Sequence, residues 1–553
     1  MKKILLIAAL VLLVLAGSAI WIWRSTGITD PAVILPADTV AFVSLPDLPR
    51  TGMRWPKTTL SQIGAELEMK DFLAKPLQYL TENWGGDEAA DLLLKLKPGR
   101  IFAATLSASG KEAAMVVGFQ YWGGKSAYDT AVARLRQEIA AGQATKEPTK
   151  ENYQGTEIAS STQNGVSIFS ATQGWWGFLS NDLPALKATL DRATGRVREN
   201  SLAESARYQT VVSHLLTDPD LILFVQPQEI LTSLLEIGRS LGAQVIPQQI
   251  DQARKVEALG ATIKLDGADL HDRIFVLRPN PPEIGSLTHK AARFAGKDAT
   301  AYFDFIANFA QISSLSTNPL LARFAGLPGF QESKLPELLP QAFGPECAVT
   351  VSWEESPDGL LAVEVRDAAR AEESLQELLA LFPETTVQEA DGVRNYSFPT
   401  LQSSFANPTL TLTKDFLLIG LNENTLAAAR QTAGSGSSLE AAAAFAHVLP
   451  SYSAANEMFG YVDMRNLFER GYPMLRQIMI FGAALMPGIS DVIDSSKLPN
   501  TDTIAQHLNP IVFSQSRLPN GYLVDSQGPI TMNQAVILGV LAGRPFLNLL
   551  PSQ

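Results

Sequence analysis

Two stretches of this chain, LILFVQPQEIL at residues 221–231 and MFGYVDMRNLF at residues 458–468, follow nearly the same pattern. Each opens with an apolar run typical of a β-strand, continues with a polar break, and then reads as the start of a helix. The two stretches begin 237 positions apart in a chain of 553 residues. A strand-to-helix unit repeated at this separation predicts two structural repeats.

Outward from these stretches, the same series of elements recurs in both halves of the chain. Segments of matching type follow one another at similar spacing, and the clearest pairs are 38–48 with 298–309, 100–120 with 346–367, 128–139 with 371–382, 166–191 with 407–432, and 202–212 with 439–449. Because the matched positions share few identical residues, the order and spacing of the elements carry the prediction. Two unrelated domains that share common supersecondary motifs are the alternative.

The expected fold class is α+β. Antiparallel meanders interrupted by helices favour this class over a doubly wound parallel sheet. The predicted organisation is an N-terminal anchor at residues 1–24, a tether at 25–34, a first α+β repeat at 35–278, a linker at 279–297, and a second repeat at 298–553 that ends in an apolar segment.

Local signals predict several helices. Apolar spacing predicts one continuous helix over residues 60–84 and another over 202–215. A third is expected over 182–195, with Asp182 as its N-cap and Pro184 in its first turn.

The N-terminus predicts the location of the protein. Lys2 and Lys3 precede an uncharged apolar run over residues 4–23, which is long enough for a helix to span the bilayer core, about 30 Å thick. The positive-inside rule places the N-terminus in the bacterial cytoplasm and the bulk of the chain in the periplasm or outside the cell. A cleaved signal peptide is the alternative, with a small-residue site at 17–19, but the apolar run continues beyond that site.

Composition disfavours nucleic-acid binding. The chain carries 44 Lys and Arg against 56 Asp and Glu, so its net charge is −12, and it has no long basic run. The single cysteine, Cys347, excludes a disulfide within one chain and is expected to be a small core residue.

Three stretches carry a resemblance to a known family: LPADTVAFVSLPDL at 35–48, DFLLIGLNENTLAAARQ at 415–431 and FGYVDMRNL at 459–467. With the N-terminal anchor, this pattern resembles a family of exported, membrane-anchored bacterial proteins known only as a domain of unknown function. The resemblance implies the location and the architecture. It supplies no catalytic residues.

Two segments partly match the sequence patterns of known ligand sites. Gly123-Gly124-Lys125-Ser126 lies between a strand and a helix, but a phosphate-binding P-loop needs glycine at position 119, which is Phe119. We therefore expect no nucleotide site, and interpret Ser126 as a helix N-cap. The acidic run of Asp266, Asp269 and Asp272 around His271 lacks the frame of a calcium loop and is typical of a hairpin turn at Asp266-Gly267.

No other motif indicates a metal or a catalytic centre. The five histidines, at positions 214, 271, 289, 447 and 507, form no closely spaced pair of the kind that zinc sites use. The glycine- and serine-rich run at 434–438 lacks the serine-hydrolase pattern and is expected to be a flexible connection. Trp175 and Trp176 are expected to pack in the core or on a sheet face rather than line a ligand pocket.

The sequence thus predicts no catalytic, cofactor-binding or metal-binding residue and no cofactor. The favoured function is a non-enzymatic, membrane-anchored binding or scaffolding protein with an envelope protein as a further expected partner, and its ligand is expected in a cleft between the repeats. The alternatives are an envelope hydrolase with a site assembled from distant residues and a carrier of apolar molecules. The C-terminal apolar run at 535–543 is too short to cross a membrane.

Overall fold

The structure is a computed structural model that describes residues 30–535 except for 85–90, 93, 108–112, 140–146, 164–165, 230, 232–250, 252, 284, 308, 310–328, 331, 354–355, 391–392, 404–405 and 486–491. The chain forms two compact units. Among the described residues, the first comprises 30–57, 76–266 and 272–279, and the second comprises 58–75, 267–271 and 280–535.

The expected membrane anchor at 1–24 and the first half of the tether, residues 25–29, lie outside the described residues. Within the described part of the chain, no helix combines the length and the apolar character needed to cross a membrane.

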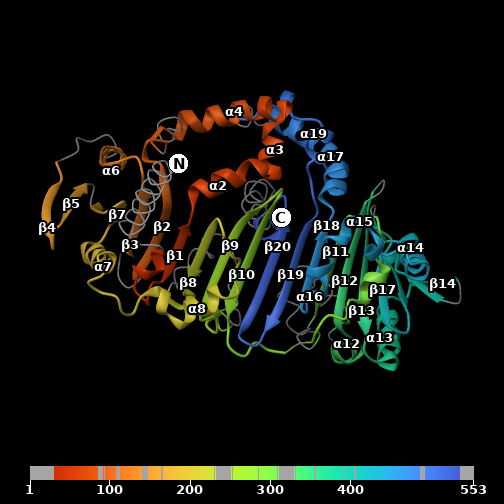
Figure 1. Cartoon of the computed structure of the whole chain (residues 1–553). Coiled ribbons are helices and arrows are strands. Elements are labelled where there is room, and N and C mark those ends of the chain that lie inside the picture. The colour runs from red at the N-terminus through yellow and green to blue at the C-terminus, as the bar shows by residue number, and fades with distance from the viewer. Residues whose placement is uncertain are drawn as a thin grey trace, which may run out of the picture. The chain divides into compact units, whose positions relative to one another are not determined.

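The strands of the first unit form an antiparallel array around β1 (Figure 1). The strand order is β4 (Thr149–Tyr153), β5 (Thr156–Gln163), β6 (Val166–Gln173), β7 (Trp176–Ser180), β3 (Ala114–Tyr121), β2 (Pro98–Ser107), β1 (Ala41–Leu45), β8 (Leu221–Val225), β9 (Ala258–Asp266) and β10 (Asp269–Leu277). The turn between β9 and β10 confirms the predicted hairpin, with Gly267 at a φ of 68°.

The strands of the second unit form an antiparallel array around β11. The order is β14 (Thr386–Ala390), β15 (Val393–Ser397), β16 (Thr409–Leu412), β17 (Phe416–Gly420), β13 (Pro357–Val365), β12 (Phe343–Trp353), β11 (Ala301–Ile306), β18 (Met458–Val462), β19 (Ile511–Leu518) and β20 (Gly521–Gly528). Taken in chain order, the ten strands of this unit have the same neighbours as the ten strands of the first. The mixture of helices with antiparallel sheet confirms the α+β fold class.

The helices of the first unit are α2 (Leu48–Arg54), α6 (Lys125–Ile139), α7 (Leu183–Ala193) and α8 (Ala206–Val212), with short 3-10 helices η1 (Pro31–Val33), η2 (Trp55–Lys57), η3 (Leu202–Glu204) and η4 (Pro227–Glu229). Those of the second are α3 (Thr59–Ala65), α12 (Leu335–Ala342), α13 (Ala368–Leu381), α14 (Glu423–Ser435), α15 (Ala443–Ala446), α16 (Leu449–Ala454), α17 (Met464–Leu485) and α19 (Thr501–Ala505), with η5 (Lys290–Phe294), η7 (Pro399–Leu401), η8 (Leu439–Ala441) and η9 (Ser495–Lys497). Helix α4 (Leu67–Trp84) lies in the second unit up to Lys75 and in the first from Pro76 on.

The two stretches with matching sequence patterns form β8 and β18, which pair with β1 and β11, respectively. The first residue after each strand makes the same kind of backbone bond. The amide of Gln226 donates to the oxygen of Val40 at 2.8 Å, and the amide of Asp463 donates to the oxygen of Thr300 at 2.9 Å. The shared apolar pattern therefore places each strand beside the first strand of its own unit.

Each unit buries its own aromatic core. In the first, Phe102 lies 5.9 Å from Trp176 and 6.5 Å from Phe178 between ring centroids, and all three side chains are buried. In the second, Phe445 packs edge-on against Phe459 and Tyr461. Edge-to-face contacts of this kind add stability beyond the burial of apolar area.

Several local predictions need correction. Residues 60–84 do not form one helix, because Glu66 takes an extended backbone (ψ 143°) between α3 and α4. Residues 202–215 form η3 and α8 rather than one helix, with Ser205 extended between them. Helix α6 begins at Lys125, so Ser126 lies inside its first turn and is not the N-cap. The run at 434–438 is only partly a connection, since α14 extends to Ser435 and Gly436 ends it with a φ of 68°.

Candidate functional site

The candidate site begins at the N-terminus of α14, in the second unit. Asn422 caps this helix, because its side-chain oxygen accepts a hydrogen bond from the amide of Thr425 at 3.0 Å. The sequence Leu421-Asn422-Glu423-Asn424-Thr425 follows β17 directly and contains the polar side chains that favour a helix start. The same turn of helix presents the Thr425 hydroxyl to the neighbouring strand β13.

The Thr425 hydroxyl meets the carboxylate of Asp358, near the start of β13. Its oxygen lies 2.6 and 2.8 Å from the two carboxylate oxygens, and the amide of Gly359 donates to Asp358 at 2.8 Å. Hydrogen bonds to a charged group are shorter and stronger than those between neutral groups. Since the partial positive charge of a helix N-terminus also favours a carboxylate, Asp358 is held firmly at this end of α14.

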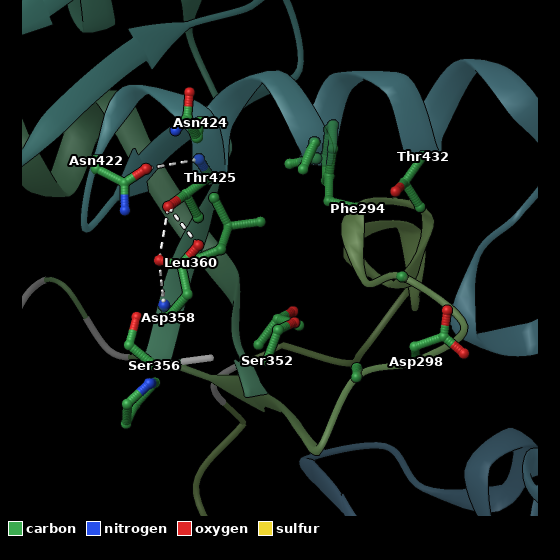
Figure 2. Close-up of a pocket in the computed structure, with 17 residues that line it drawn as sticks. Phe294, Asp298, Ser352, Ser356, Asp358, Leu360, Asn422, Asn424, Thr425 and Thr432 are labelled. Carbon is green, nitrogen blue, oxygen red and sulfur yellow. Dashed lines mark hydrogen bonds between the residues drawn. The ribbon is translucent and has the colours of Figure 1, made fainter. Parts of the chain in front are cut away.

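A groove of about 510 Å³ extends from Asp358 along α14 (Figure 2). Helix α14, the segment after η5 and the adjoining ends of β12 and β13 supply its walls. The lining residues are Phe294, Gly296, Asp298, Ala299, Thr350, Ser352, Ser356, Pro357, Asp358, Gly359, Leu360, Asn422, Asn424, Thr425, Ala428, Ala429 and Thr432. Figure 2 shows Asp358 and Asp298 at opposite sides of the groove, with Thr425 on α14 above Asp358 and Thr432 on α14 above Asp298.

Several polar groups of the groove have no partner among the described residues. They are the carboxylate of Asp298, the amide of Asn424, and the hydroxyls of Ser352, Ser356 and Thr432. These groups include both hydrogen-bond donors and acceptors. Phe294 and Leu360 add apolar surface, so the groove offers hydrogen bonds together with van der Waals contact.

The charge of the groove is negative. Two carboxylates line it, and the seventeen lining residues include no lysine, arginine or histidine. A phosphate or carboxylate ligand would therefore meet repulsion without a compensating cation. The position at the helix N-terminus that could attract an anion is already occupied by Asp358.

A second polar cluster of the same unit is structural. His289 Nδ1 lies 3.1 Å from Oδ2 of Asp304, and its Nε2 lies 3.2 Å from the backbone oxygen of Ala455. A doubly protonated imidazole, which is a cation, donates to both of these oxygens at once. Glu346, fully buried, accepts hydrogen bonds from Thr288 and from the amide of Ala291, which fixes the start of η5.

Burial and the charge of Asp304 shift the pKa of His289 in opposite directions. Burial lowers the pKa of His289, but the hydrogen bond and the charge of Asp304 outweigh it, and the pKa rises above its ordinary value. Cys347 lies nearby in β12, where burial raises the pKa of its thiol to about 12. This cysteine is buried, as expected, and its high pKa makes it a poor nucleophile.

Two residues of the acidic run at 266–272 each contact a different partner. Asp269 binds the side chain of Asn509 at 3.0 Å, and His271 lies 2.7 Å from Asp525. In the described part of the chain, no three His, Cys, Asp or Glu side chains are grouped so as to hold a metal ion. Trp176 is 1% exposed, in the core as predicted, and Trp175 packs on Trp122 at 5.7 Å.

Sequence reasoning missed the groove entirely. Its polar residues come from three segments that are distant in the chain, within 294–299, 350–360 and 422–432, and Asp, Asn, Ser and Thr at such places are typical of turns and helix caps. The one usable signal was the run Asn422-Glu423-Asn424-Thr425, which places more polar groups at a helix start than capping requires.

The comparisons with known proteins concern a part of the chain. Residues 124–295 match the model of a family described as Protein of unknown function (DUF3352). No curated protein matches the chain.

Solved structures of TP0453 are weakly similar. Its crystal form III has 9% sequence identity and a TM-score of 0.28 over 46% of this chain and 82% of that one. Crystal form I has 8% identity and a TM-score of 0.27 over 46% of this chain and 81% of that one. The match over residues 124–295 confirms the expected resemblance of this chain to a family known only as a domain of unknown function.

Proposed function

We propose that this protein is a membrane-anchored, extracytoplasmic binding protein whose groove along α14 holds an uncharged, hydroxyl-rich ligand such as a short saccharide. The observation that carries the proposal is the set of unpartnered polar groups in the groove, combined with the absence of any cation among its lining residues. Sugar hydroxyls both donate and accept hydrogen bonds, so they can satisfy carboxylates, amides and hydroxyls together.

The size of the groove fits a small ligand. From Thr425 to Thr432 the axis of α14 advances by about 10 Å, at roughly 1.5 Å per residue. The volume, about 510 Å³, lies within the usual range for small-molecule sites. Both values suit one or two sugar rings.

A gene duplication is the second part of the proposal. The two units share one strand order, and α7 and α14 follow equivalent strands, β7 and β17. Asp182 and Asn422 cap these helices in the same way, and Leu186 and Leu426 are both fully buried one turn later. Proteins that arise by duplication commonly keep the pattern of the core while their polar residues diverge.

The equivalent helix of the first unit lacks the polar residues of the groove. Counting from the caps, Pro184, Ala185 and Arg192 stand where α14 has Asn424, Thr425 and Thr432. The guanidinium of Arg192 donates to the backbone oxygen of Glu199 at 2.7 Å. This difference supports a binding role for the second unit and a structural role for α7.

The anchor and the location rest on the sequence of residues 1–24, with lysines before an uncharged apolar run. Binding is favoured over hydrolysis because glycoside hydrolysis uses two carboxylates, and one of the two here, Asp358, is already engaged by the Thr425 hydroxyl and the Gly359 amide.

A thermal-shift screen tests the proposed ligand class. The full chain in detergent is heated with maltose, diacetylchitobiose, spermidine or inorganic phosphate, because a ligand that binds the folded state raises the midpoint of unfolding. We expect one of the neutral saccharides to raise the midpoint. Stabilisation by phosphate alone or by spermidine alone would contradict the proposal.

A further inference from the structure

Strands β2, β3 and β7 of the first unit are apolar on both faces. Phe102, Val116 and Phe178 lie on the face that holds the aromatic core, and each is at most 1% exposed. Because side chains alternate along a strand, Ile101 and Phe119, which pair across β2 and β3, lie on the opposite face. This second apolar face needs a cover of its own.

Helix α6 supplies part of that cover. Tyr128 and Val132 of α6 are each 4% exposed, and Phe119 and Leu179 of the strands pack against the cluster that contains them. The ring of Tyr128 stacks on Phe119 at 5.6 Å between centroids, and its hydroxyl donates to the backbone oxygen of Ala171 at 3.2 Å. These contacts fix the helix against the strands.

An apolar pocket of about 240 Å³ lies between α6 and the same strands. The lining residues are Leu96, Pro98, Ile101, Val117, Phe119, Ala131, Val132 and Leu179. None of these eight side chains has a nitrogen, oxygen or sulfur atom, so none of them can form a hydrogen bond with a ligand or with water. An apolar cavity of about 150 Å³ already excludes water and can hold a molecule such as benzene.

The corresponding layer of the second unit is packed more tightly. By strand pairing, Cys347 corresponds to Ile101. Val363, which pairs with Cys347, corresponds in the same way to Phe119. Cys347 and Val363 are buried, and Leu339 of α12 packs against the cluster that they form. Ile101 and Phe119 are only partly buried, so the first unit leaves open a space that the same strand order fills in the second.

We propose that the pocket beneath α6 binds a saturated, unbranched hydrocarbon chain. Seven of the eight lining side chains are not aromatic, and the exception, Phe119, already stacks on Tyr128, which favours an alkyl chain over an aromatic ring as the ligand. Each methylene group that leaves water for the pocket should strengthen binding about fourfold. The proposal concerns the first unit alone and is independent of the ligand in the groove along α14.

Fluorine NMR on the full chain in amphipol tests the pocket. The probe is an octanol with a terminal trifluoromethyl group, whose resonance depends on the surroundings of the chain end. Ala131→Leu fills the pocket from α6, and Ala133→Leu, which adds the same side chain at an exposed position of this helix, is the matched control. Thermal unfolding checks that both variants fold. Val117→Phe, which fills the pocket from β3, replaces Ala131→Leu should that variant be unfolded.

We expect a resonance of bound probe, distinct from that of probe in the amphipol, for the unmodified chain and for Ala133→Leu. Ala131→Leu should abolish it, and the equivalent hexanol, shorter by two methylene groups, should bind roughly 15-fold more weakly. A bound resonance that Ala131→Leu leaves unchanged would overturn the proposal, as would its absence from the unmodified chain. Binding of trifluorotoluene without binding of the alcohol would also overturn it, because the site would then be one for aromatic rings.

Displacement of the probe separates the two sources of such a chain. Displacement by octanoate supports a free fatty acid as the ligand, and displacement by an octanoyl lysophospholipid supports the tail of a lipid. If neither compound displaces the probe, the pocket does not accept a natural hydrocarbon chain and the proposal fails.

Discussion

Thr425 and Asp358 fix one end of the groove through hydrogen bonds that join α14 to β13. Thr425 is 8% exposed, so its hydroxyl is shielded from water that could replace it. We expect Thr425→Val to lower the free energy of unfolding by about 1–3 kcal/mol, because it leaves the carboxylate without this donor. Thr425→Ser keeps the hydroxyl and is the control. Denaturant unfolding curves that coincide for Val and Thr at position 425 would refute this contribution.

His289 gives the stability of the second unit a dependence on pH. Its pKa is raised in the folded state, so its contribution is complete below the unfolded pKa, about 6.5, and is lost as the pH rises through the folded value. His289→Gln should therefore make the unfolding free energy fall less steeply above pH 6.5. The exposed His447, changed to Gln, is the control. An unchanged slope for His289→Gln would show that the ion pair with Asp304 contributes nothing.

For single residues, the sequence predicts a role that depends only on neighbours in the chain. Asp182 caps α7 as expected, with its carboxylate accepting from the amide of Ala185 at 2.8 Å. Asp358 and Asp298 were not predicted as site residues, because their meeting in one groove depends on the pairing of β12, β13 and β17. Long-range pairing of this kind leaves no signal in the local sequence.

Among the elements, helix α19 depends on a carboxylate from a distant part of the chain. Glu68, at the start of α4, accepts from the backbone amide of Asn500 at 2.8 Å, from its side-chain amide at 2.7 Å and from the Thr503 hydroxyl at 2.7 Å. The first of these bonds does most to lower the pKa of Glu68. Its contribution is thus present above the ordinary glutamate pKa and is lost as the pH falls through the lowered value.

We expect Glu68→Ala to speed amide hydrogen exchange in α19, residues 501–505, at neutral pH, because Asn500 loses its acceptor. Exchange in α7, which contains no contact with Glu68, serves as the internal reference. Identical exchange in α19 with and without the carboxylate would mean that solvent replaces these bonds fully.

Strands with continuous apolar runs were predictable from the sequence, and two polar strands were not. The sequences of β8 and β18 gave strands directly, whereas β4, with the sequence TKENY and four exposed residues, was missed. β14 was missed for the same reason. Such edge strands form because their backbone pairs with the free N–H and C=O groups of a neighbouring strand. Burial of their own side chains contributes little.

For the whole molecule, the segment 58–75 is the feature that sequence patterns did not predict. It lies in the N-terminal half of the chain but packs within the second unit, where Glu66 lies 2.7 Å from His507. We expect a chain cut at a protease site placed between Pro279 and Asn280 to remain in one piece on size-exclusion chromatography. Glu66→Ala combined with Glu68→Ala should weaken the association, and immediate separation of the unmutated fragments would contradict this packing.

The proposed duplication and the proposed ligand groove together imply that the second unit binds the ligand because its α14 differs from α7. Isothermal titration of the full chain with the saccharide that stabilises it, before and after Thr432→Arg, tests this claim most directly. Thr432→Arg installs the residue that the first unit has at this place, and Arg192→Thr is the matched control. We predict that Thr432→Arg abolishes the heat of binding while Arg192→Thr leaves it unchanged; undiminished binding by Thr432→Arg would show that the ligand lies elsewhere.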